Sequence, residues 1–576
     1  MRLELIEIVC SRFSRALYRI QSLQSTRAVL NAQGIEVLTL SGERHLLADC
    51  WLSEPAIGRN NFFWLQLRAR FLSGLHDGLL IPIRAELSMF LTDQIRIFRS
   101  RAAAGLAAIL VFCALFAPAM ATPGAEHRPP NVVIIFADDL GYGDLGCFGH
   151  PTIRTPHLDR MAAEGMRLTQ FYAAASVCTP SRAALLTGRL PIRSGMCSTH
   201  RPVLFPDSAG GLPDEEITLA EALKEKGYAT ACVGKWHLGH LPQFLPTKNG
   251  FDYYFGIPYS NDMDRTVDRK VVRTVFLEPK IEYFNVPLMR NEEIIERPAD
   301  QRTITKRYTL EAVKFIEDHR NEPFFVYLPH NLPHVPLFRS DEFAGRSSRG
   351  LYGDVIEEID WSVGIVLDTL RKLDLDRNTL VFFTSDNGPW LNYKEHGGSA
   401  GLLRDGKGST WEGGMREPTV AWWPGRIPAG AVSQELGCTM DIFATCLKLA
   451  DVEVPRDRVI DGVDLRPVLF ENGASPRETM FYYRGARLMA VRKGPWKAHF
   501  ATISSFHRKP YTEQDPPLLF HLEQDPAEAN NRADEHPQTI AELRRLVAEH
   551  QSQLVARETQ LELRIDEETG ATDAEK

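Results

Sequence analysis

The stretch Asn131-Val132-Val133-Ile134-Ile135-Phe136-Ala137, with Asp138-Asp139 directly behind it, decides the fold. A continuous run of apolar, largely β-branched residues is typical of a strand that is buried on both faces of a parallel sheet. Runs of the same kind follow at 230–233, 324–328, 380–384 and 419–423. Helical patterns lie between them, at 157–164, 219–226, 308–320 and 355–373. Strands that alternate with helices predict an α/β domain with a large, mostly parallel sheet.

The pattern changes after about residue 470. Short strand-like segments separated by turn residues lie at 481–483, 488–492, 496–500 and 518–522, and helical spacing follows over 540–554. These features predict a smaller antiparallel sheet with one helix. We therefore expect three parts after residue 128: an α/β domain over 129–468, an α+β subdomain over 469–560 and a polar tail over 561–576.

The composition is that of a globular protein. The chain has 576 residues, of which 44% are hydrophobic and 24% are charged, and this balance excludes a wholly disordered or fibrous protein. The formal net charge is −8, so there is no overall basic field and we expect no nucleic-acid partner. Residues 1–121 differ from the rest because they contain arginine but no lysine and carry a net positive charge.

An export signal lies inside this N-terminal part. The longest uncharged apolar run covers 102–117, follows Arg96, Arg99 and Arg101, and is followed by Ala119-Met120-Ala121. A basic segment, an apolar segment and an A-x-A site in this order are typical of a secretory signal peptide.

A signal peptide belongs at the N-terminus, whereas this one lies about 100 residues into the chain. We therefore expect translation to begin at or near Met89, so that 89–121 is the signal peptide and 1–88 is an extension that is not translated. The alternative is a single transmembrane helix behind a small N-terminal domain, although the run is short for a membrane span. We expect an exported protein, either periplasmic or secreted.

Acidic and amide side chains follow two of the predicted strands. Asp138 and Asp139 come after the first strand, and Asp386 and Asn387 come after the strand at 380–384. Each pair by itself is more often a turn. Ligands of open α/β sheets bind beyond the carboxyl ends of strands, and hard divalent cations take oxygen ligands. The two strand ends together therefore predict a cation site.

The segment Gly141-Tyr142-Gly143-Asp144-Leu145-Gly146 matches the G-x-G-x-x-G pattern of dinucleotide-binding proteins. Several aspartates would face the pyrophosphate there, and Phe148-Gly149-His150-Pro151 does not continue a helix. We therefore reject a dinucleotide site.

The most specific feature is Cys178-Thr179-Pro180-Ser181-Arg182, followed by Leu186-Thr187-Gly188-Arg189. Pro180 suits the first turn of a helix and Gly188 suits its C-terminal cap. Cys178 would then lie at a helix N-terminus, where free N–H groups favour an anion. The alternative is an ordinary buried cysteine in front of a helix.

This C-x-P-S-R pattern with its trailing L-T-G-R resembles the signature of the sulfatase family. The resemblance covers nearly all of 131–560 and includes the segments at 234–239, 385–388 and 406–408. Within the family, 412–418 and 422–425 are most similar to the subgroup of arylsulfatase A and N-acetylgalactosamine-6-sulfatase. The resemblance implies an alkaline-phosphatase-like sandwich. It also implies that Cys178 is oxidised to Cα-formylglycine by a formylglycine-generating enzyme, and that the hydrated aldehyde is the nucleophile.

The resemblance assigns roles to further residues. It implies one divalent cation, Ca²⁺, held by Asp138, Asp139, Asp386, Asn387 and the modified Cys178. It implies that the sulfate is bound by Arg182, Lys235 and Lys407, with a hydrogen bond from Ser260. His237 and His334 form the implied acid–base pair, because histidine titrates near neutral pH. His330 is a rival to His334, since spacing does not fix which ring points inward.

The expected function is that of a sulfuric ester hydrolase that cleaves sulfate monoesters of aryl or sugar substrates, and N-acetylgalactosamine-6-sulfatase is one candidate for the specific activity. One alternative is a phosphate or phosphonate monoester hydrolase of the same superfamily. Another is a catalytically silent binding protein in which Cys178 is never oxidised. The residues after 121 are acidic overall, so a binding site for a sulfated glycan would be a local basic cleft. The sequence does not indicate an oligomeric state.

Overall fold

The computed structural model describes residues 26–31, 34–39, 44–49, 128–267, 272–505 and 511–565. The chain divides into two compact units, Met1–Thr122 and Pro123–Lys576. In the first unit, three strands form an antiparallel sheet in the order β1 (Thr26–Asn31), β2 (Gly34–Thr39) and β3 (Arg44–Asp49). The expected signal peptide at 89–121 lies outside the described residues, and the start at Met89 stays a prediction. None of the described helices is long and apolar enough to span a membrane.

The second unit is built on a ten-stranded mixed sheet with the order β10-β9-β8-β7-β11-β4-β12-β13-β5-β14. Its five central strands are parallel: β8 (Tyr253–Gly256), β7 (Ala229–Val233), β11 (Phe324–Pro329), β4 (Asn131–Ala137) and β12 (Thr379–Ser385). The outer strands are β9 (Leu288–Arg290), β10 (Glu293–Glu296), β13 (Thr419–Trp422), β5 (Met166–Leu168) and β14 (Ala431–Ser433). The prediction of a large, mostly parallel sheet is confirmed.

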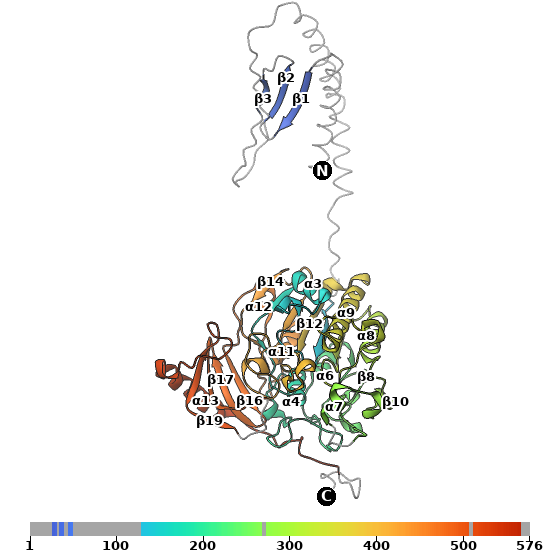
Figure 1. Ribbon diagram of the computed structural model, residues 1–576, viewed down its shortest axis with the longest axis vertical. Coiled ribbons are helices and arrows are strands. Elements are labelled where there is room, and N and C mark those ends of the chain that lie inside the picture. The colour runs from blue at the N-terminus through green and yellow to red at the C-terminus, as the bar shows by residue number, and fades with distance from the viewer. Residues whose placement is uncertain are drawn as a thin grey trace, which may run out of the picture. The chain divides into compact units, whose positions relative to one another are not determined.

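Helices cover both faces of this sheet (Figure 1). Val133 and Ile135 of β4 point into one core, and Ile134 and Phe136 point into the other, as the alternation of strand side chains requires. The first core is shared with α3 (Pro156–Glu164), α8 (Ile304–Asp318) and α9 (Leu351–Lys372). The second core is shared with α4 (Cys178–Thr187), α6 (Leu219–Lys224) and α11 (Thr439–Leu449). The result is the expected three-layer sandwich.

The remaining elements of this domain are short. A two-stranded parallel sheet is formed by β6 (Phe171–Tyr172) and β15 (Gly437–Cys438). The short helices are α5 (Pro191–Ser194), α7 (Val272–Leu277), α10 (Glu412–Met415) and α12 (Arg466–Glu471).

The C-terminal subdomain is a four-stranded antiparallel sheet with one helix (Figure 1). Its strands are β16 (Thr479–Arg484), β17 (Arg487–Lys493), β18 (Trp496–Thr502) and β19 (Thr512–His521). Helix α13 (Pro537–Gln553) packs on this sheet through Ile540, Leu543 and Val547. The predicted α+β architecture is confirmed, and the helix begins three residues before the predicted start because Pro537 occupies its first turn.

A buried ionic cluster joins this sheet to the larger domain. Nζ of Lys497 in β18 lies 2.9 Å from Oε1 of Glu412 in α10 and 3.1 Å from Oε1 of Glu528. All three side chains are fully buried. Burial by itself would raise the pKa of Glu412, but Lys497 and Arg416 outweigh it and hold this pKa at about 2. The larger domain and the sheet therefore share one desolvated set of charges.

Candidate active site

Two neighbouring strands bring the acidic residues together. In the parallel pairing of β4 with β12, Ala137 lies opposite Ser385, so the residues that follow each strand leave the sheet at the same edge. The backbone N–H of Asp139 donates to Oδ1 of Asp386 at 3.1 Å. Nδ2 of Asn387 donates to Oδ1 of Asp139 at 2.7 Å. The two strand ends singled out in the sequence thus form one site.

Cys178 and His334 complete this acidic cluster. One ligand atom from each of Asp138, Asp139, Cys178 and His334 lies within 4.8 Å of the other three, and all four residues are buried. Cys178 is the first residue of α4, as the sequence predicts, and its Sγ is 3.5 Å from Oδ1 of Asp138. The group has the ligand atoms and the compactness of a metal site.

The donor set fits a hard cation. Among the described residues, Oδ1 of Asn387 is buried and accepts no hydrogen bond. This orphaned amide oxygen adds to the carboxylates of Asp138, Asp139 and Asp386, and oxygen donors of this kind suit Ca²⁺ or Mg²⁺.

The pKa values of the three carboxyl groups show how closely they are packed. Burial, together with the charges of Asp138 and Asp386, raises the pKa of Asp139 to about 7 despite the opposing effect of Lys407. Burial and Asp138 also raise the pKa of Asp386. Burial alone would raise the pKa of Asp138, but Lys235 and Arg182 outweigh it and lower this pKa. Additional positive charge at this point would let all three carboxylates ionise together.

Two lysines face the cluster from different loops. Nζ of Lys235, which follows β7, lies 2.6 Å from Oδ2 of Asp138 and 3.3 Å from Oγ of Ser260. Nζ of Lys407 lies 2.7 Å from Oδ1 of Asp139 and 3.5 Å from Sγ of Cys178. The structure therefore brings Lys235, Lys407 and Ser260 to the cluster, as the sequence analysis expects.

Arg182 lies beneath the carboxylates and is fully buried. Its Nη2 is 2.7 Å from Oδ2 of Asp386 and 3.4 Å from Oδ1 of Asp138, and its Nη1 donates to the carbonyl oxygen of Lys235 at 3.2 Å. The guanidinium thus contacts two carboxylates and one backbone carbonyl oxygen of the protein.

His237 is held as a neutral ring with one free nitrogen. Its Nε2 lies 2.9 Å from the carbonyl oxygen of Leu204, which can only accept, so this nitrogen carries the proton. Nδ1 is buried and has no partner among the described residues. Burial lowers the pKa of His237 well below its ordinary value, and Lys235 lowers it further. The free nitrogen has the properties of a general base.

The structure distinguishes His334 from His330. Nε2 of His334 is 3.6 Å from Oδ2 of Asp139, and Nδ1 contacts the carbonyl oxygen of Val335 at 2.5 Å. Burial lowers the pKa of His334, and Lys407 lowers it further. His330 lies outside the cluster, and its Nε2 is 3.4 Å from Oγ of Ser362 in α9. Of these two histidines, His334 is the one whose ring lies beside the cluster.

An aromatic group that was not predicted from the sequence lies beside the site. The ring of Trp390 lies 5.3 Å from the ring of His334, and Nζ of Lys407 lies 4.5 Å from the centre of the indole. Tyr393 packs edge-on against Trp390 at 4.7 Å. Trp390 follows Asn387 by three residues, and this short spacing is the one signal that could have revealed it.

Glu417, in the segment 412–418, is a second residue near the site for which the sequence indicated no role. It is fully buried, and neither of its carboxyl oxygens has a partner among the described residues. Burial raises its pKa well above the ordinary value, and the charges of Asp386 and Asp139 raise it further. Its surroundings therefore favour the protonated form of this carboxyl group.

Comparison with known families agrees with this geometry. Residues 130–452 match the model of the sulfatase family, and residues 475–571 match the model described as the C-terminal region of aryl-sulfatase. The chain belongs to the sulfatase family. As a sulfatase it is an enzyme that hydrolyses sulfate esters.

Similar proteins cover most of this sulfatase. It is 43% identical to N-acetylgalactosamine-6-sulfatase of Mus musculus over 79% of this chain and 91% of the relative. It is also 43% identical to arylsulfatase A of Homo sapiens over 72% of this chain and 85% of the relative. The crystal structure of the PsFucS1 sulfatase from Pseudoalteromonas sp. superposes with a TM-score of 0.66 at 31% identity, over 74% of this chain and 90% of that one. The expected family and fold are confirmed.

Proposed function

We propose that this sulfatase is a formylglycine-dependent sulfuric ester hydrolase that uses one Ca²⁺ ion. Cys178 would be oxidised to formylglycine, and Asp138, Asp139, Asp386, Asn387 and the modified Cys178 would hold the cation. One observation carries the proposal: Sγ of Cys178 lies 3.5 Å from both a buried carboxylate, Asp138, and a partly buried ammonium, Lys407. A nucleophile formed at this atom would sit between a cation site and a positively charged side chain.

When bound, the cation would polarise the sulfate ester, and the hydrated aldehyde of residue 178 would offer one hydroxyl for attack and a second that allows sulfate to be expelled. Lys235, Lys407 and Ser260 would bind the sulfate oxygens, because each lysine contacts a carboxylate of the cluster and Ser260 lies beside Lys235. Arg182 would act mainly by holding Asp138 and Asp386 in position, since its guanidinium already contacts both.

Proton transfer is assigned to three side chains. His237 would remove a proton at its free Nδ1, because the contact of Nε2 with Leu204 fixes the tautomer. His334, together with Lys407, would protonate the leaving alcohol. Because the pKa of His334 is lowered and its Nδ1 faces the carbonyl oxygen of Val335, the ring would first gain a proton at Nε2. Lys407 carries the proton that this step needs, because nearby acids raise its pKa against the opposing effect of burial and keep it an ammonium.

The substrate class we propose is a sulfate monoester of an aryl alcohol or a sugar. Relatives at 43% identity are named N-acetylgalactosamine-6-sulfatase and arylsulfatase A, and the first name makes 6-sulfated N-acetylgalactosamine the sugar to test first. Phosphate or phosphonate monoester hydrolysis is the competing activity, because similar metal ligands can serve it.

Purified enzyme matured by a formylglycine-generating enzyme tests this proposal directly. We expect turnover of 4-nitrophenyl sulfate to exceed that of 4-nitrophenyl phosphate. The peptide that contains residue 178 should have the mass of the aldehyde, which is lighter than the thiol. Full turnover by a protein that keeps an unmodified Cys178 thiol would contradict the mechanism.

We further propose that the enzyme is exported to the periplasm or secreted, with translation starting at or near Met89 and 89–121 removed as a signal peptide. Mass spectrometry of the mature protein from its native source should find an N-terminus near Thr122. Recovery of peptides from residues 1–88 would contradict the proposed start.

A further inference from the structure

A hydrogen bond from Arg484 connects the C-terminal sheet to the loop that contains Lys407. It is the last residue of β16, and its Nε donates to the carbonyl oxygen of Gly408 at 2.8 Å. The N–H of Gly408 in turn donates to the carbonyl oxygen of Ser176 at 2.8 Å. Arg484 is therefore linked through one glycine to Lys407 and to the segment that leads into Cys178.

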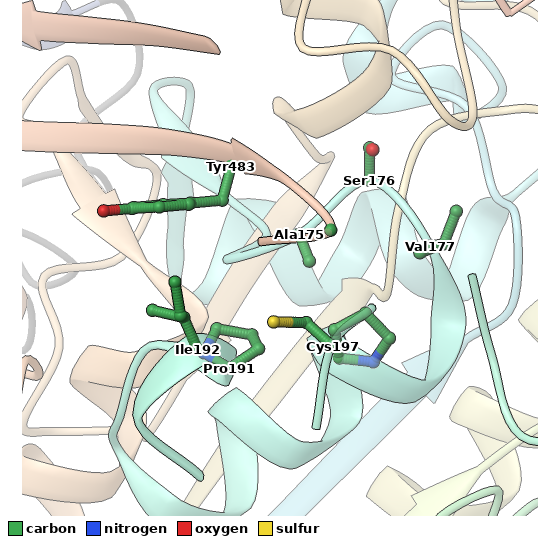
Figure 2. Close-up of a pocket in the computed structure, with 9 residues that line it drawn as sticks. Ala175, Ser176, Val177, Pro191, Ile192, Cys197 and Tyr483 are labelled. Carbon is green, nitrogen blue, oxygen red and sulfur yellow. The ribbon is translucent and has the colours of Figure 1, made fainter. Parts of the chain in front are cut away.

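The end of β16 lies against that same segment (Figure 2). Figure 2 shows Tyr483, the neighbour of Arg484, across a small apolar cavity from Ile192, with Ala175 and Ser176 beside it. The C-terminal sheet thus reaches the chain immediately before the proposed nucleophile.

The charge of Arg484 is not balanced by an acid. Within residues 128–267, 272–505 and 511–565, no carboxylate forms an ion pair with Arg484, and Nη1 and Nη2 donate no hydrogen bond. Arg487, at the other end of the same hairpin turn, pairs with Glu513. Burial lowers the pKa of Arg484, and only the more distant Tyr511 opposes this effect. A partly buried cation without a counter-charge is costly, so a second role is expected for it.

The contact with Gly408 uses one of the five N–H groups of the guanidinium. Nη1 and Nη2 are not fully buried, so these two nitrogens remain accessible to solvent. A planar fork of this kind matches a carboxylate or a sulfate, which can accept two parallel hydrogen bonds from it.

Building on the proposed function, we propose that Arg484 binds a second anionic group of the substrate next to the scissile sulfate. The group would be a carboxylate or a further sulfate on the leaving alcohol. Arg484 then makes the enzyme prefer sulfate esters with two negative charges over esters with one.

Four substrates test this preference. 4-Nitrophenyl sulfate reports the basic reaction, and N-acetylgalactosamine 6-sulfate is the singly charged sugar. N-acetylgalactosamine 4,6-disulfate adds a sulfate, and a disaccharide of glucuronate and 6-sulfated N-acetylgalactosamine adds a carboxylate. Released nitrophenol or sulfate gives kcat and KM for each. The two doubly charged sugars distinguish the two sources of the anion.

For wild-type enzyme we expect a higher kcat/KM with at least one doubly charged sugar than with the singly charged one. In Arg484→Met the ratio of these two values should fall about tenfold or more, mainly through KM, because charge-assisted hydrogen bonds are lost. Arg484→Lys should recover part of the ratio for the disulfate and less for the carboxylate, since an ammonium lacks the planar fork. Arg487→Met is the matched control and should leave the ratio unchanged, because Arg487 is already paired with Glu513.

An unchanged ratio in Arg484→Met would overturn the proposal, and so would a loss of equal size on all substrates, which would mean that Arg484 only positions the Lys407 loop. Failure of the wild-type enzyme to hydrolyse either doubly charged sugar would also overturn it. These outcomes differ from failure of the proposed function, in which wild-type enzyme does not hydrolyse 4-nitrophenyl sulfate at all.

Discussion

The ammonium group of Lys407 lies 3.5 Å from Sγ of Cys178, although the two residues are 229 positions apart in the chain. Lys407 comes from a loop after β12, whereas Cys178 is the first residue of α4. The same ammonium lies 2.7 Å from Oδ1 of Asp139. The position at which a sulfate would meet the nucleophile therefore has a fixed positive charge before any substrate arrives.

Replacing Lys407 should remove this charge where negative charge develops. We expect Lys407→Met to lower kcat/KM for 4-nitrophenyl sulfate about 10²- to 10³-fold, the usual effect of losing one preorganised donor. Steady-state kinetics measure the change. Lys448→Met, at an exposed position of α11, is the control and should keep normal activity. A decrease of less than about threefold in Lys407→Met would argue against a role in catalysis.

The identity of the nucleophile is tested at residue 178. Cys178→Ser offers a single hydroxyl in place of two, so we expect multiple turnover to fall by at least about 10³-fold. Thermal unfolding should change little because the side chains are similar in size. Cys197→Ser, at another buried cysteine, is the matched control and should keep its activity. Normal multiple turnover by Cys178→Ser would refute the mechanism.

Removal of the cation should affect both activity and stability. Without it, Asp138, Asp139 and Asp386 are crowded and compete for protons. We expect chelation with EGTA to abolish turnover and to lower Tm by several degrees, and we expect added Ca²⁺ to restore both. Metal analysis and calorimetry check this. Full activity in protein that contains less than a tenth of an equivalent of metal would rule out the cation.

Trp390 should matter because its indole packs against both His334 and Lys407. Trp390→Ala would expose these two side chains to water and loosen their geometry. We expect kcat/KM to fall roughly 10-fold, since misplacement of catalytic groups by about 1 Å can cost up to 10²-fold. Trp390→Phe should retain most of the activity. Equal kinetics for Trp390→Ala and the wild-type enzyme would show that the aromatic contact is irrelevant.

The carboxyl group of Asp360 gives a prediction about stability and pH. It accepts hydrogen bonds from the backbone N–H groups of His157 and Leu158 at the start of α3. Burial raises its pKa to about 7 despite these bonds. In the unfolded chain this carboxyl group loses its proton near pH 4. Between about pH 4 and 7 the folded protein therefore binds a proton at Asp360 that the unfolded chain does not, and the free energy of unfolding falls as the pH rises through this window.

We therefore expect the denaturant midpoint of the wild-type protein to fall between pH 5 and 8 relative to that of Asp360→Asn, which cannot ionise. Urea titrations at several pH values measure the difference. Parallel pH profiles for the two proteins would show that Asp360 does not contribute. Asp368→Asn serves as the control, because Asp368 is a partly exposed acid on the same helix, paired with Arg160.

The central sheet could be predicted because its strands carry continuous apolar runs. Six consecutive apolar residues in β4, 132–137, leave no polar face, so burial on both sides follows from the sequence alone. Two of the outer strands, β5 and β14, were missed because each has three residues, which is too short for a periodic pattern. Their pairing depends on the folded sheet and not on local preference.

The site was predictable to the extent that it lies at strand ends. Asp138 and Asp386 could be assigned to one site because parallel strands share a carboxyl edge, but only the structure shows that β4 and β12 are direct neighbours. His334 and His330 follow the same strand, β11, and spacing could not separate them. Trp390 and Arg484 escaped prediction because their proximity to Lys407 is a property of tertiary packing.

Lys497 reaches out of the C-terminal sheet to Glu412, so a chain that stopped before residue 475 would take away the closer of this carboxylate's two basic partners and leave only Arg416. Breaking a buried pair in this way costs about 3–5 kcal/mol, a large share of the free energy that keeps a domain folded. Recombination or proteolysis that separated the two family regions would therefore destabilise the larger one, and we expect the two regions to be inherited together.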